Sequence, residues 1–388
     1  MSGPVSVAVV GLGFGRAHVY EALRLDSVRL AAVVELTDPR EDHRLLGDPA
    51  RDQILAVPHF RSLEDLLAHD VPDIVALATP IHTHAALAEL ALRAGAHVLL
   101  EKPPTATLSE HRRLLSIARE SRRAVQVGFQ ARGGGGVDAV RRAVEAGAVG
   151  DVIRIAAVGR WVRRRGYYRR AAWAGRRSLG GVPVMDGALT NPFAHAVDIA
   201  LALDGAFAAD DVTDVTVDAW HAHDIEADDT TSVIIRTTSG TEIAVALTLC
   251  AENEELSPTV RVIGTDGEIR LHYTEDRVEW PASETGRPEK FARASLLENL
   301  AAHVTHGSAL IAPLERTGAF MSILEASRDA AAPRRVPPVA ASWVGIDDEA
   351  RPIVHGVDEW CERVAASGMT FTQLGAPWTT APLPAPAR

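Results

Sequence analysis

The first 130 residues alternate short apolar runs with segments of helical periodicity, and no other feature constrains the fold of this chain as strongly. Such alternation is typical of a parallel sheet whose strands are joined by helices. We expect strands at residues 5–10, 28–36, 73–79, 97–100 and 124–129. The sequence therefore predicts an α/β domain over residues 1–130, with a doubly wound parallel sheet of the kind that binds nucleotides.

Helix-boundary residues agree with this interpretation. Ser62 and Thr107 are each followed three residues later by an acidic residue, which is the spacing of a capping box at the start of a helix. Gly95 stands where a helix over residues 84–93 is expected to end. These local signals predict helices between the strands.

The pattern changes after Phe129. The four glycines at 133–136 are unsuited to the interior of a helix or strand, so we expect a hinge or loop at a domain boundary. Longer alternating runs follow, with hairpin turns expected at Ser239-Gly240 and Asp266-Gly267. We predict a second domain over residues 131–342, an antiparallel sheet with helices on one face, including helices at 191–203 and 295–303. Residues 343–388 read as a C-terminal extension whose tail, PLPAPAR, is frayed.

Composition excludes several classes of protein. A net charge of −11 argues against nucleic acid or an anionic membrane as the main partner. Two cysteines, Cys250 and Cys361, are too few for a disulfide framework or a Cys-rich zinc site, and they favour a reducing compartment. The N-terminus lacks the pattern of a signal peptide, and no uncharged apolar run is long enough to span a membrane. We expect a soluble cytoplasmic protein.

A glycine-rich segment, Gly11-Leu12-Gly13-Phe14-Gly15-Arg16, follows the first expected strand. Glycine at such a turn lets the backbone approach a pyrophosphate, which the start of the next helix attracts. Gly11, Gly13, Phe14 and Gly15 are therefore candidate cofactor-binding residues. The usual third glycine position is Arg16, so we expect the helix to pack less closely on the strand.

Glu35 ends the second expected strand, where a carboxylate can accept the ribose hydroxyls of a dinucleotide. Its charge would repel a 2′-phosphate and favours NAD over NADP, although Arg40 nearby keeps NADP as an alternative. A structural turn with a solvent-facing Glu35 is the plain alternative.

Lys102 is a candidate for proton chemistry. It is one of two lysines, with Lys290, among 40 basic residues, and a lysine ammonium can be tuned for proton transfer where arginine cannot. It follows the fourth expected strand in Glu101-Lys102-Pro103, at the sheet edge where ligands of parallel sheets bind. The same arrangement recurs on an adjacent strand and its helix, where four residues are further candidate cofactor-binding residues: Thr79, Pro80, His82 and His84. The alternative for both segments is turn chemistry, with the histidines capping the next helix.

The order of these motifs resembles the Gfo/Idh/MocA family of NAD(P)-dependent oxidoreductases. The matching segments are GLGFGR, Glu35, Thr79-Pro80-Ile81-His82-Thr83-His84, Glu101-Lys102-Pro103 and Val127-Gly128-Phe129. The resemblance implies an N-terminal Rossmann domain, a C-terminal domain with an open and mostly antiparallel sheet, and a homodimer or homotetramer built through that sheet. It also implies a sugar-like substrate, a lysine at position 102 between nicotinamide and substrate, and Glu101 beside the cofactor.

The resemblance further implies a histidine on a helix of the second domain, matched by His195, with an aspartate four residues earlier. Here Asn191 stands in that place, so a strong Asp-His pair is missing and Lys102 carries more of the proton transfer. Residues four apart lie on one helix face, so we expect Asn191 and His195 to point together at a substrate hydroxyl. Asp186 approaches the site or serves as a turn residue.

Eight arginines lie between Arg160 and Arg177, interleaved with aromatic residues that include Trp173. One interpretation is a loop that binds an anionic substrate group and stacks a sugar on Trp173; the other is a solvated or subunit-facing loop. His221 and His223 do not suggest a metal site, because spacing places no third ligand near them. We expect no metal.

We predict an oxidoreductase acting on CH–OH groups, which transfers a hydride between a secondary alcohol of a sugar, inositol or glycoside and nicotinamide. Lys102 moves the hydroxyl proton, His195 shares it and Asn191 orients the hydroxyl. One alternative is a lyase, hydrolase or epimerase that oxidises a glycoside transiently with bound NAD. Another is a non-catalytic NAD and sugar sensor.

Overall fold

A computed structural model describes residues 3–254, 256–281 and 286–380. The chain forms two compact units, which we call the first unit (residues 1–133 and 294–317) and the second unit (residues 134–293 and 318–388). The sequence analysis placed domain boundaries after residues 130 and 342, and it did not foresee that residues 294–317 belong to the first unit. The predicted frayed tail, residues 382–388, lies outside the described residues.

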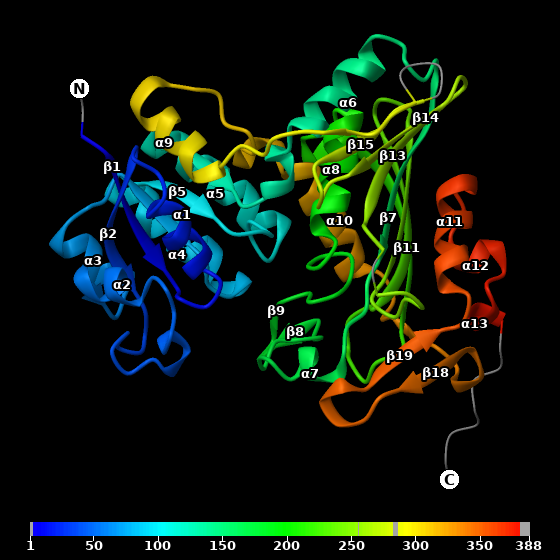
Figure 1. The fold of residues 1–388 in the computed structure, drawn as a ribbon, viewed down its shortest axis with the longest axis horizontal. Helices are drawn as coiled ribbons and strands as arrows, with labels where there is room; N and C mark the ends of the chain where they lie inside the picture. Colours follow the sequence, from blue (N-terminus) through cyan, green and yellow to red (C-terminus); the bar gives the residue numbers. More distant parts are fainter. Residues whose placement is uncertain (1–2, 255, 282–285, 381–388) are drawn as a thin grey trace. The chain divides into compact units, whose positions relative to one another are not determined.

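The first unit is built on a six-stranded parallel sheet (Figure 1) with the order β3-β2-β1-β4-β5-β6. Its strands are β1 (Val5–Val10), β2 (Val28–Val34), β3 (His59–Phe60), β4 (Ile74–Leu77), β5 (His97–Leu100) and β6 (Val125–Val127). The predicted Rossmann-type sheet is confirmed. The short β3 pairs with the end of β2 and carries no apolar run of its own, so the sequence pattern did not reveal it.

Helices join these strands, and local capping explains where several begin and end. They are α1 (Arg16–Ala22), α2 (Arg51–Ala56), α3 (Leu63–His69), α4 (Ile81–Ala94), α5 (Leu108–Ser121) and, from the returning segment, α9 (Leu296–His306). The Ser62 hydroxyl accepts a bond from the Asp65 amide, and Thr107 forms a capping box with Glu110. Gly95 ends α4 in the left-handed conformation.

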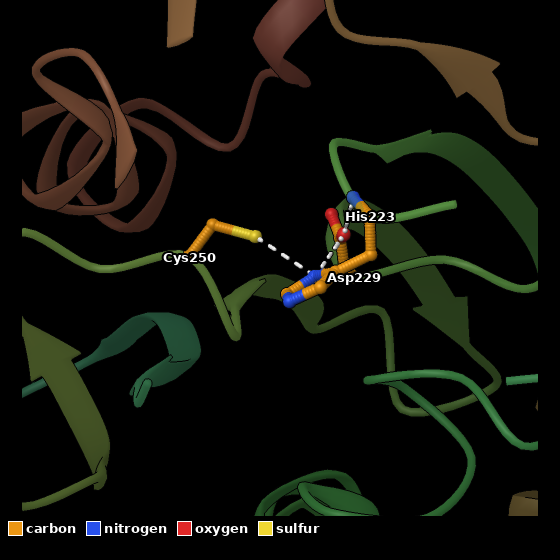
Figure 2. Close-up of side chains that lie close together, drawn as sticks. All are labelled: His223, Asp229 and Cys250. Carbon is orange, nitrogen blue, oxygen red and sulfur yellow. Dashed lines mark hydrogen bonds and ion pairs between the residues drawn. The ribbon is translucent and has the colours of Figure 1, made fainter. Parts of the chain in front are cut away.

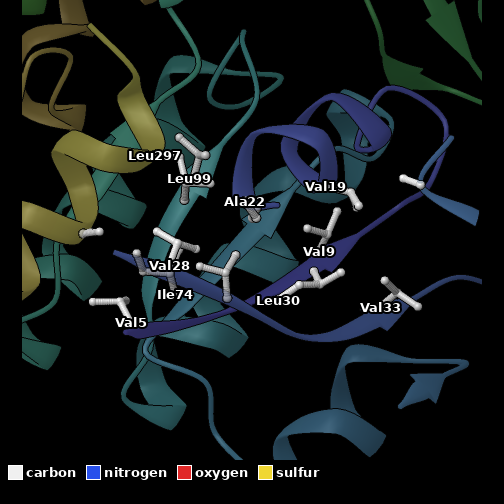
Figure 3. Packing of buried hydrophobic residues seen from close by; sticks show 14 of the residues in the cluster. Val5, Val9, Val19, Ala22, Val28, Leu30, Val33, Ile74, Leu99 and Leu297 are labelled. Carbon is white, nitrogen blue, oxygen red and sulfur yellow. The ribbon is translucent and has the colours of Figure 1, made fainter. Parts of the chain in front are cut away.

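The core of the first unit lies between the sheet and its helices (Figure 3). Val9, Leu30, Ile74 and Leu99 point from the strands toward Val19 and Ala22 of α1 and Leu297 of α9. The periodicity of residues 295–303 predicted a helix, and α9 confirms it. Its apolar face, with Leu296, Leu297, Leu300 and Ala301, completes this core rather than that of the second unit.

The second unit contains a nine-stranded sheet with the order β16-β15-β14-β13-β7-β12-β11-β10-β17. The strands are β7 (Val152–Arg160), β10 (Val212–His221), β11 (Thr230–Thr237), β12 (Glu242–Thr248), β13 (Thr259–Gly264), β14 (Glu268–His272), β15 (Arg277–Glu279), β16 (Glu289–Lys290) and β17 (Arg334–Arg335). The β7–β12 and β10–β17 pairs are parallel and the other neighbours are antiparallel. The mostly antiparallel sheet and both predicted hairpins are confirmed.

Helices cover both faces of this sheet, whereas the sequence predicted helices on one face only. Figure 1 shows α6 (Gly135–Glu145), α8 (Ala194–Asp204) and α10 (Gly318–Asp329) on one side and α11 (Val357–Ser367), α12 (Phe371–Leu374) and α13 (Pro377–Thr380) on the other. On the second side, Ala156 and Val158 of β7 share one buried cluster with Cys361, Phe371 and Trp378. The extension therefore supplies a hydrophobic layer of the second unit, because its apolar residues bury the centre of the sheet.

The second unit also contains the short helix α7 (Arg165–Tyr168) and two small antiparallel sheets. One pairs β8 (Ser178–Leu179) with β9 (Val182–Pro183), and the other pairs β18 (Ala341–Val344) with β19 (Arg351–Val354). No helix in the described part of the chain is long and apolar enough to cross a membrane.

The glycine run at 133–136 lies where the chain passes from the first unit to the second, but its second half is α-helical. Gly135 and Gly136 begin α6, which the sequence analysis excluded. A Cβ on Gly136 would lie 3.0 Å from Leu271 and 3.1 Å from Val278, so its lack of a side chain allows α6 to pack closely on the sheet. Close packing, rather than hinge flexibility, explains this glycine.

Candidate active site

The glycine loop of the first unit joins β1 to α1. Gly11 has a φ of +85°, and a Cβ there would lie 2.6 Å from the carbonyl oxygen of Ala78. A Cβ on Gly15 would lie 2.0 Å from the carbonyl oxygen of Gly11. Gly15 thus provides the close packing that the sequence analysis expected to be weakened by Arg16, and that expectation was wrong. The Arg16 guanidinium instead donates to the carbonyl oxygen of Arg44 at 2.7 Å.

Gly13 and Phe14 form the exposed tip of this loop. No heavy atom lies within 4 Å of a Cβ built on Gly13, and the Phe14 side chain is 60% exposed. The loop is therefore held by Gly11 and Gly15 at its base while the backbone at Gly13 is open. This arrangement fits a pyrophosphate that binds against bare backbone.

Glu35 follows β2 and lies against the same loop. One carboxylate oxygen accepts the amide N–H of Leu12 at 2.8 Å, and the other accepts that of Leu36 at 2.9 Å. Oε1 has a further lone pair, so the group still fits a ribose hydroxyl of a dinucleotide. Arg44, not Arg40, is the basic neighbour, with Nη2 at 3.5 Å from Oε2. The glycine loop and Glu35 together fit NAD.

Thr79, Pro80, His82 and His84 lie where β4 leads into α4. His82 is exposed, whereas His84 is buried with Nδ1 at 2.9 Å from the carbonyl oxygen of Pro103 and Nε2 at 2.8 Å from that of Thr79. His84 therefore links the loop after β4 to the turn that carries Lys102. We assign His84 a positioning role; its predicted contact with the cofactor stays a prediction.

Glu101 is buried and forms an ion pair that the sequence analysis missed. Its Oε1 lies 3.0 Å from Nε2 of His18 in α1 and accepts a bond from Gln130 at 3.2 Å. Burial lowers the pKa of His18, but the bonds and charges of Glu101 and Glu21 outweigh this effect and raise the pKa from 6.5 to about 9. A buried imidazolium therefore holds Glu101 beside α1, and a sequence separation of 83 positions hid this pair.

This pair predicts a pH dependence of stability. Because the folded-state pKa of His18 lies above its ordinary value, the stabilisation from His18 is complete below pH 6.5, falls between pH 6.5 and about 9, and is lost above that range. The difference in unfolding free energy between the wild type and His18→Gln, measured by urea unfolding, is expected to shrink across this window. The exposed His82→Gln serves as the control. A difference that stays constant from pH 6 to pH 10 contradicts the assignment.

Lys102 is half-buried in the turn after β5, and the Lys102–Pro103 peptide bond is cis. The amide of Lys102 donates to Glu101 at 3.2 Å. The turn is thus held on one side by the His18–Glu101 pair and on the other by the bond from His84 to Pro103. The first unit brings the glycine loop, Glu35, the Thr79 loop and Lys102 to the carboxyl end of one parallel sheet, as predicted.

In the second unit, Asn191 lies before α8 rather than on it. The helix begins at Ala194, and residues 187–193 form a tight turn in which the Asn191 amide donates to the carbonyl oxygen of Gly187 at 3.0 Å. The prediction that Asn191 and His195 share one helix face was therefore wrong. Pro192 after Asn191 disfavours helical geometry at Asn191, which explains the late start.

Asp186 is buried immediately before this turn and holds it through hydrogen bonds. Its carboxylate accepts bonds from the Asn191 side-chain amide at 2.5 Å, the Gly175 amide at 2.8 Å and Arg170 at 3.1 Å. The contact with Asn191 fixes the orientation of that side chain. Asp186 therefore positions the Asn191 side chain, and its approach to a substrate stays a prediction.

A second carboxylate, on Asp228, supports the same turn and was not foreseen. It accepts the amide of Leu189 at 3.2 Å, while its backbone oxygen accepts the amide of Ala188. A Cβ on Gly187 would lie 1.9 Å from Oδ1 of Asp228, so glycine is the residue that fits at position 187. Burial raises the pKa of Asp228 from 3.8 to about 6. His195 follows this turn, half-buried in the first turn of α8.

The arginines between residues 160 and 177 pair largely within the second unit. The Arg170 guanidinium lies 3.7 Å from the ring centre of Tyr167 and 4.6 Å from that of Trp173. Arg164 pairs with Glu254, and Arg176 pairs with Glu226. These contacts give the segment structural partners; its binding of an anionic group, and that of a sugar by Trp173, remain predictions.

Family models match two stretches of the chain. The model of the GFO/IDH/MocA oxidoreductase family with an NAD-binding Rossmann fold matches residues 5–129, and the model of the GFO/IDH/MocA C-terminal domain matches residues 137–270. Together they extend over most of the two units.

Individual proteins give a consistent result. Inositol 2-dehydrogenase 1 of Saccharopolyspora erythraea is 35% identical over 162 residues, covering 41% of this chain and 47% of that protein. Levoglucosan dehydrogenase of Pseudarthrobacter phenanthrenivorans is 26% identical over 237 residues, covering 53% and 57%. The chain thus spans about half the length of the curated relatives it matches.

Among solved structures, the fold is similar to that of the WlbA dehydrogenase from Bordetella pertussis, crystallised with NADH and UDP-GlcNAcA. The TM-score is 0.68 at 21% identity, and the match covers 89% of this chain and 100% of that one. At this identity the likeness concerns the fold.

Proposed function

Because the chain belongs to the Gfo/Idh/MocA family of oxidoreductases, with the family's NAD-binding Rossmann fold at residues 5–129, we propose that it is an NAD-dependent dehydrogenase or reductase of a sugar-like alcohol. The observation that carries the proposal is the position of Lys102, at the carboxyl end of the sheet that also bears the glycine loop and Glu35. The substrate class follows the inositol and levoglucosan dehydrogenases among its relatives.

NAD, when bound, supplies the hydride chemistry, and the glycine loop and Glu35 would hold it. The chain's own residues supply position and proton transfer. Lys102 Nζ takes or returns the proton of the reacting hydroxyl, and the supports on either side of its turn keep the lysine in place. His195 shares that proton, and Asn191, fixed by Asp186, orients the hydroxyl. The roles of Asn191 and His195 rest on the family motif.

The proposed partner is a small sugar-like molecule and not a nucleic acid. The proposed location is the cytoplasm, because the low cysteine count is typical of proteins in a reducing compartment. A homodimer or homotetramer remains part of the proposal. Helix α11 covers the centre of one face of the nine-stranded sheet, at β7 and β12, and α8 packs on the other face. The subunit interface of the proposed oligomer would therefore not use the uncovered centre of this sheet. The Glu35 carboxylate beside the glycine loop supports NAD over NADP.

The test is a screen of the purified chain with NAD and NADP separately, against polyols, inositols, free sugars, uronates and aryl glycosides. We expect stoichiometric NADH formation with at least one sugar or polyol. Ultraviolet absorbance measures the NADH, and product analysis identifies the oxidised compound. Product without net NADH would favour the transient-oxidation lyase, hydrolase or epimerase instead. NAD binding without turnover of any compound would favour the sensor.

A further inference from the structure

Three buried side chains of the second unit converge outside the candidate active site (Figure 2). His223 and Asp229 come from the segment around the β10–β11 turn, and Cys250 follows β12. His223 Nδ1 lies 2.9 Å from Asp229 Oδ2 and 3.8 Å from Cys250 Sγ. One imidazole nitrogen, one carboxylate oxygen and one sulfur lie within 4.8 Å of one another, and the three residues are at most 2% exposed.

The ring of His223 faces oxygen acceptors on both sides. Its Nε2 lies 3.1 Å from the carbonyl oxygen of Arg163, and its Nδ1 faces the carboxylate of Asp229. A neutral imidazole has a single N–H, so one ring nitrogen directs a lone pair at an oxygen unless a cation lies between them. A metal ion bound at Nδ1 would fill that position and leave Nε2 to donate to the carbonyl oxygen of Arg163.

The surroundings of the ring favour the metal ion. Histidines that bind a metal through one nitrogen usually donate the other N–H to a backbone carbonyl or carboxylate, as Nε2 of His223 is placed to do toward Arg163. The sulfur of Cys250 approaches the same Nδ1 as the carboxylate does. A metal ion at this position would use all three atoms as ligands.

Asp229 is held in the orientation that a ligand needs. Its carboxylate accepts the amide N–H groups of Ala222 at 2.9 Å and His223 at 2.8 Å, and the hydroxyl of Thr230 at 3.2 Å. Hydrogen bonds of this kind typically orient metal-ligating carboxylates.

Tyr168 is a second observation that points to a ligand. Its ring centre lies 4.6 Å from that of His223, and its hydroxyl is buried without a hydrogen-bond partner in the described part of the chain. A water molecule on a metal ion would provide such a partner. Tyr168 also lines a surface hollow of about 380 Å³ with Gly175, Asp224 and Glu226.

We propose that His223, Asp229 and Cys250 bind one Zn²⁺ ion, with water in the fourth position. Zinc suits a set of imidazole, carboxylate and thiolate ligands and adopts the tetrahedral geometry that three protein ligands and a water provide. On binding, the Cys250 thiol loses its proton to solvent, and the two negative ligands offset the charge of the ion. The ion is not part of the hydride chemistry and does not depend on the proposed function.

The zinc would have a structural role. The ion would connect the β10–β11 turn to the end of β12. Asp228, the neighbour of the proposed ligand Asp229, accepts hydrogen bonds from the turn that contains Asn191. Loss of the ion would loosen this turn. The expected consequence is a lower melting temperature of the full chain after chelation, which zinc restores.

The test measures zinc in the full-length chain by mass spectrometry after incubation with zinc chloride and gel filtration. We expect about one zinc per chain in the wild type and background levels in Cys250→Ser and His223→Gln. Matched controls are Cys361→Ser, at the other buried cysteine, and His221→Gln, at the neighbouring histidine; both should retain the ion.

Cobalt substitution in the wild type tests the site without any mutation. Thiolate ligation is expected to give a sulfur-to-cobalt charge-transfer band in the near ultraviolet. A wild type that retains no zinc and shows no such band overturns the proposal. Zinc retained equally by the wild type, Cys250→Ser and His223→Gln also overturns it, because the ion then binds elsewhere.

Discussion

Lys102→Met is expected to lower kcat for the best sugar substrate by roughly 10²–10⁴-fold, the usual contribution of a general acid–base group. Methionine keeps most of the side chain's length and apolar stem but has no ammonium to exchange the hydroxyl proton. The Kd for NADH should change little, because the glycine loop and Glu35 are untouched. Steady-state kinetics and a fluorescence titration with NADH measure the two quantities.

The chain offers a matched control, since its other lysine, Lys290, is exposed on the edge strand β16. Lys290→Met should leave kcat and NADH binding unchanged. Lys102→Arg retains the charge but cannot release a proton near neutral pH, so it should be nearly as slow as Lys102→Met. If Lys102→Met keeps near-normal turnover, the assignment of the proton transfer to Lys102 is wrong.

Trp378→Ala is expected to reduce the free energy of unfolding by about 3–5 kcal/mol, the usual cost of truncating a large buried aromatic side chain. Trp378 is 1% exposed, and its ring centre lies 5.1 Å from that of Phe371 and 6.2 Å from that of Trp360. The loss would show that the C-terminal extension is part of the core of the second unit. Urea unfolding monitored by circular dichroism measures it.

Trp343→Ala is the matched control for this prediction. Trp343 lies in the same extension, on β18, but is 45% exposed, so its truncation should cost much less. Equal and small effects for the two variants would mean that the extension contributes little to stability, contrary to the buried cluster that it forms with β7.

Local chemistry explains most of what could be predicted. The parallel strands of the first unit and the hairpins of the second are visible in the sequence because apolar periodicity and turn residues act over a few positions. The same holds for the capping box at Thr107 and for the helix end at Gly95. Lys102 was identifiable because a strand end, a proline turn and its rarity coincide in one short segment.

The candidate active site was predicted in outline but not in its supports. The pattern located Glu101 and Lys102, yet it gave no sign that His18 would pair with Glu101 or that His84 would bridge two loops. Asn191 and His195 were placed on one helix because their spacing fits helical periodicity. The turn that Asp186 holds before α8 overrides that periodicity with side-chain hydrogen bonds that spacing does not reveal.

By itself, the sequence determined the two sheet types, the glycine loop and the family to which the chain belongs, because each depends on short-range patterns. The tertiary structure alone decided that α9 completes the first unit, that the C-terminal extension covers the second sheet, and that Asp229 and Cys250 meet His223. Apart from His223 and Asp229, which are six residues apart, those contacts join residues that are distant in the chain. Their partners are chosen by which apolar faces and polar groups must be buried together, and no local periodicity records that choice.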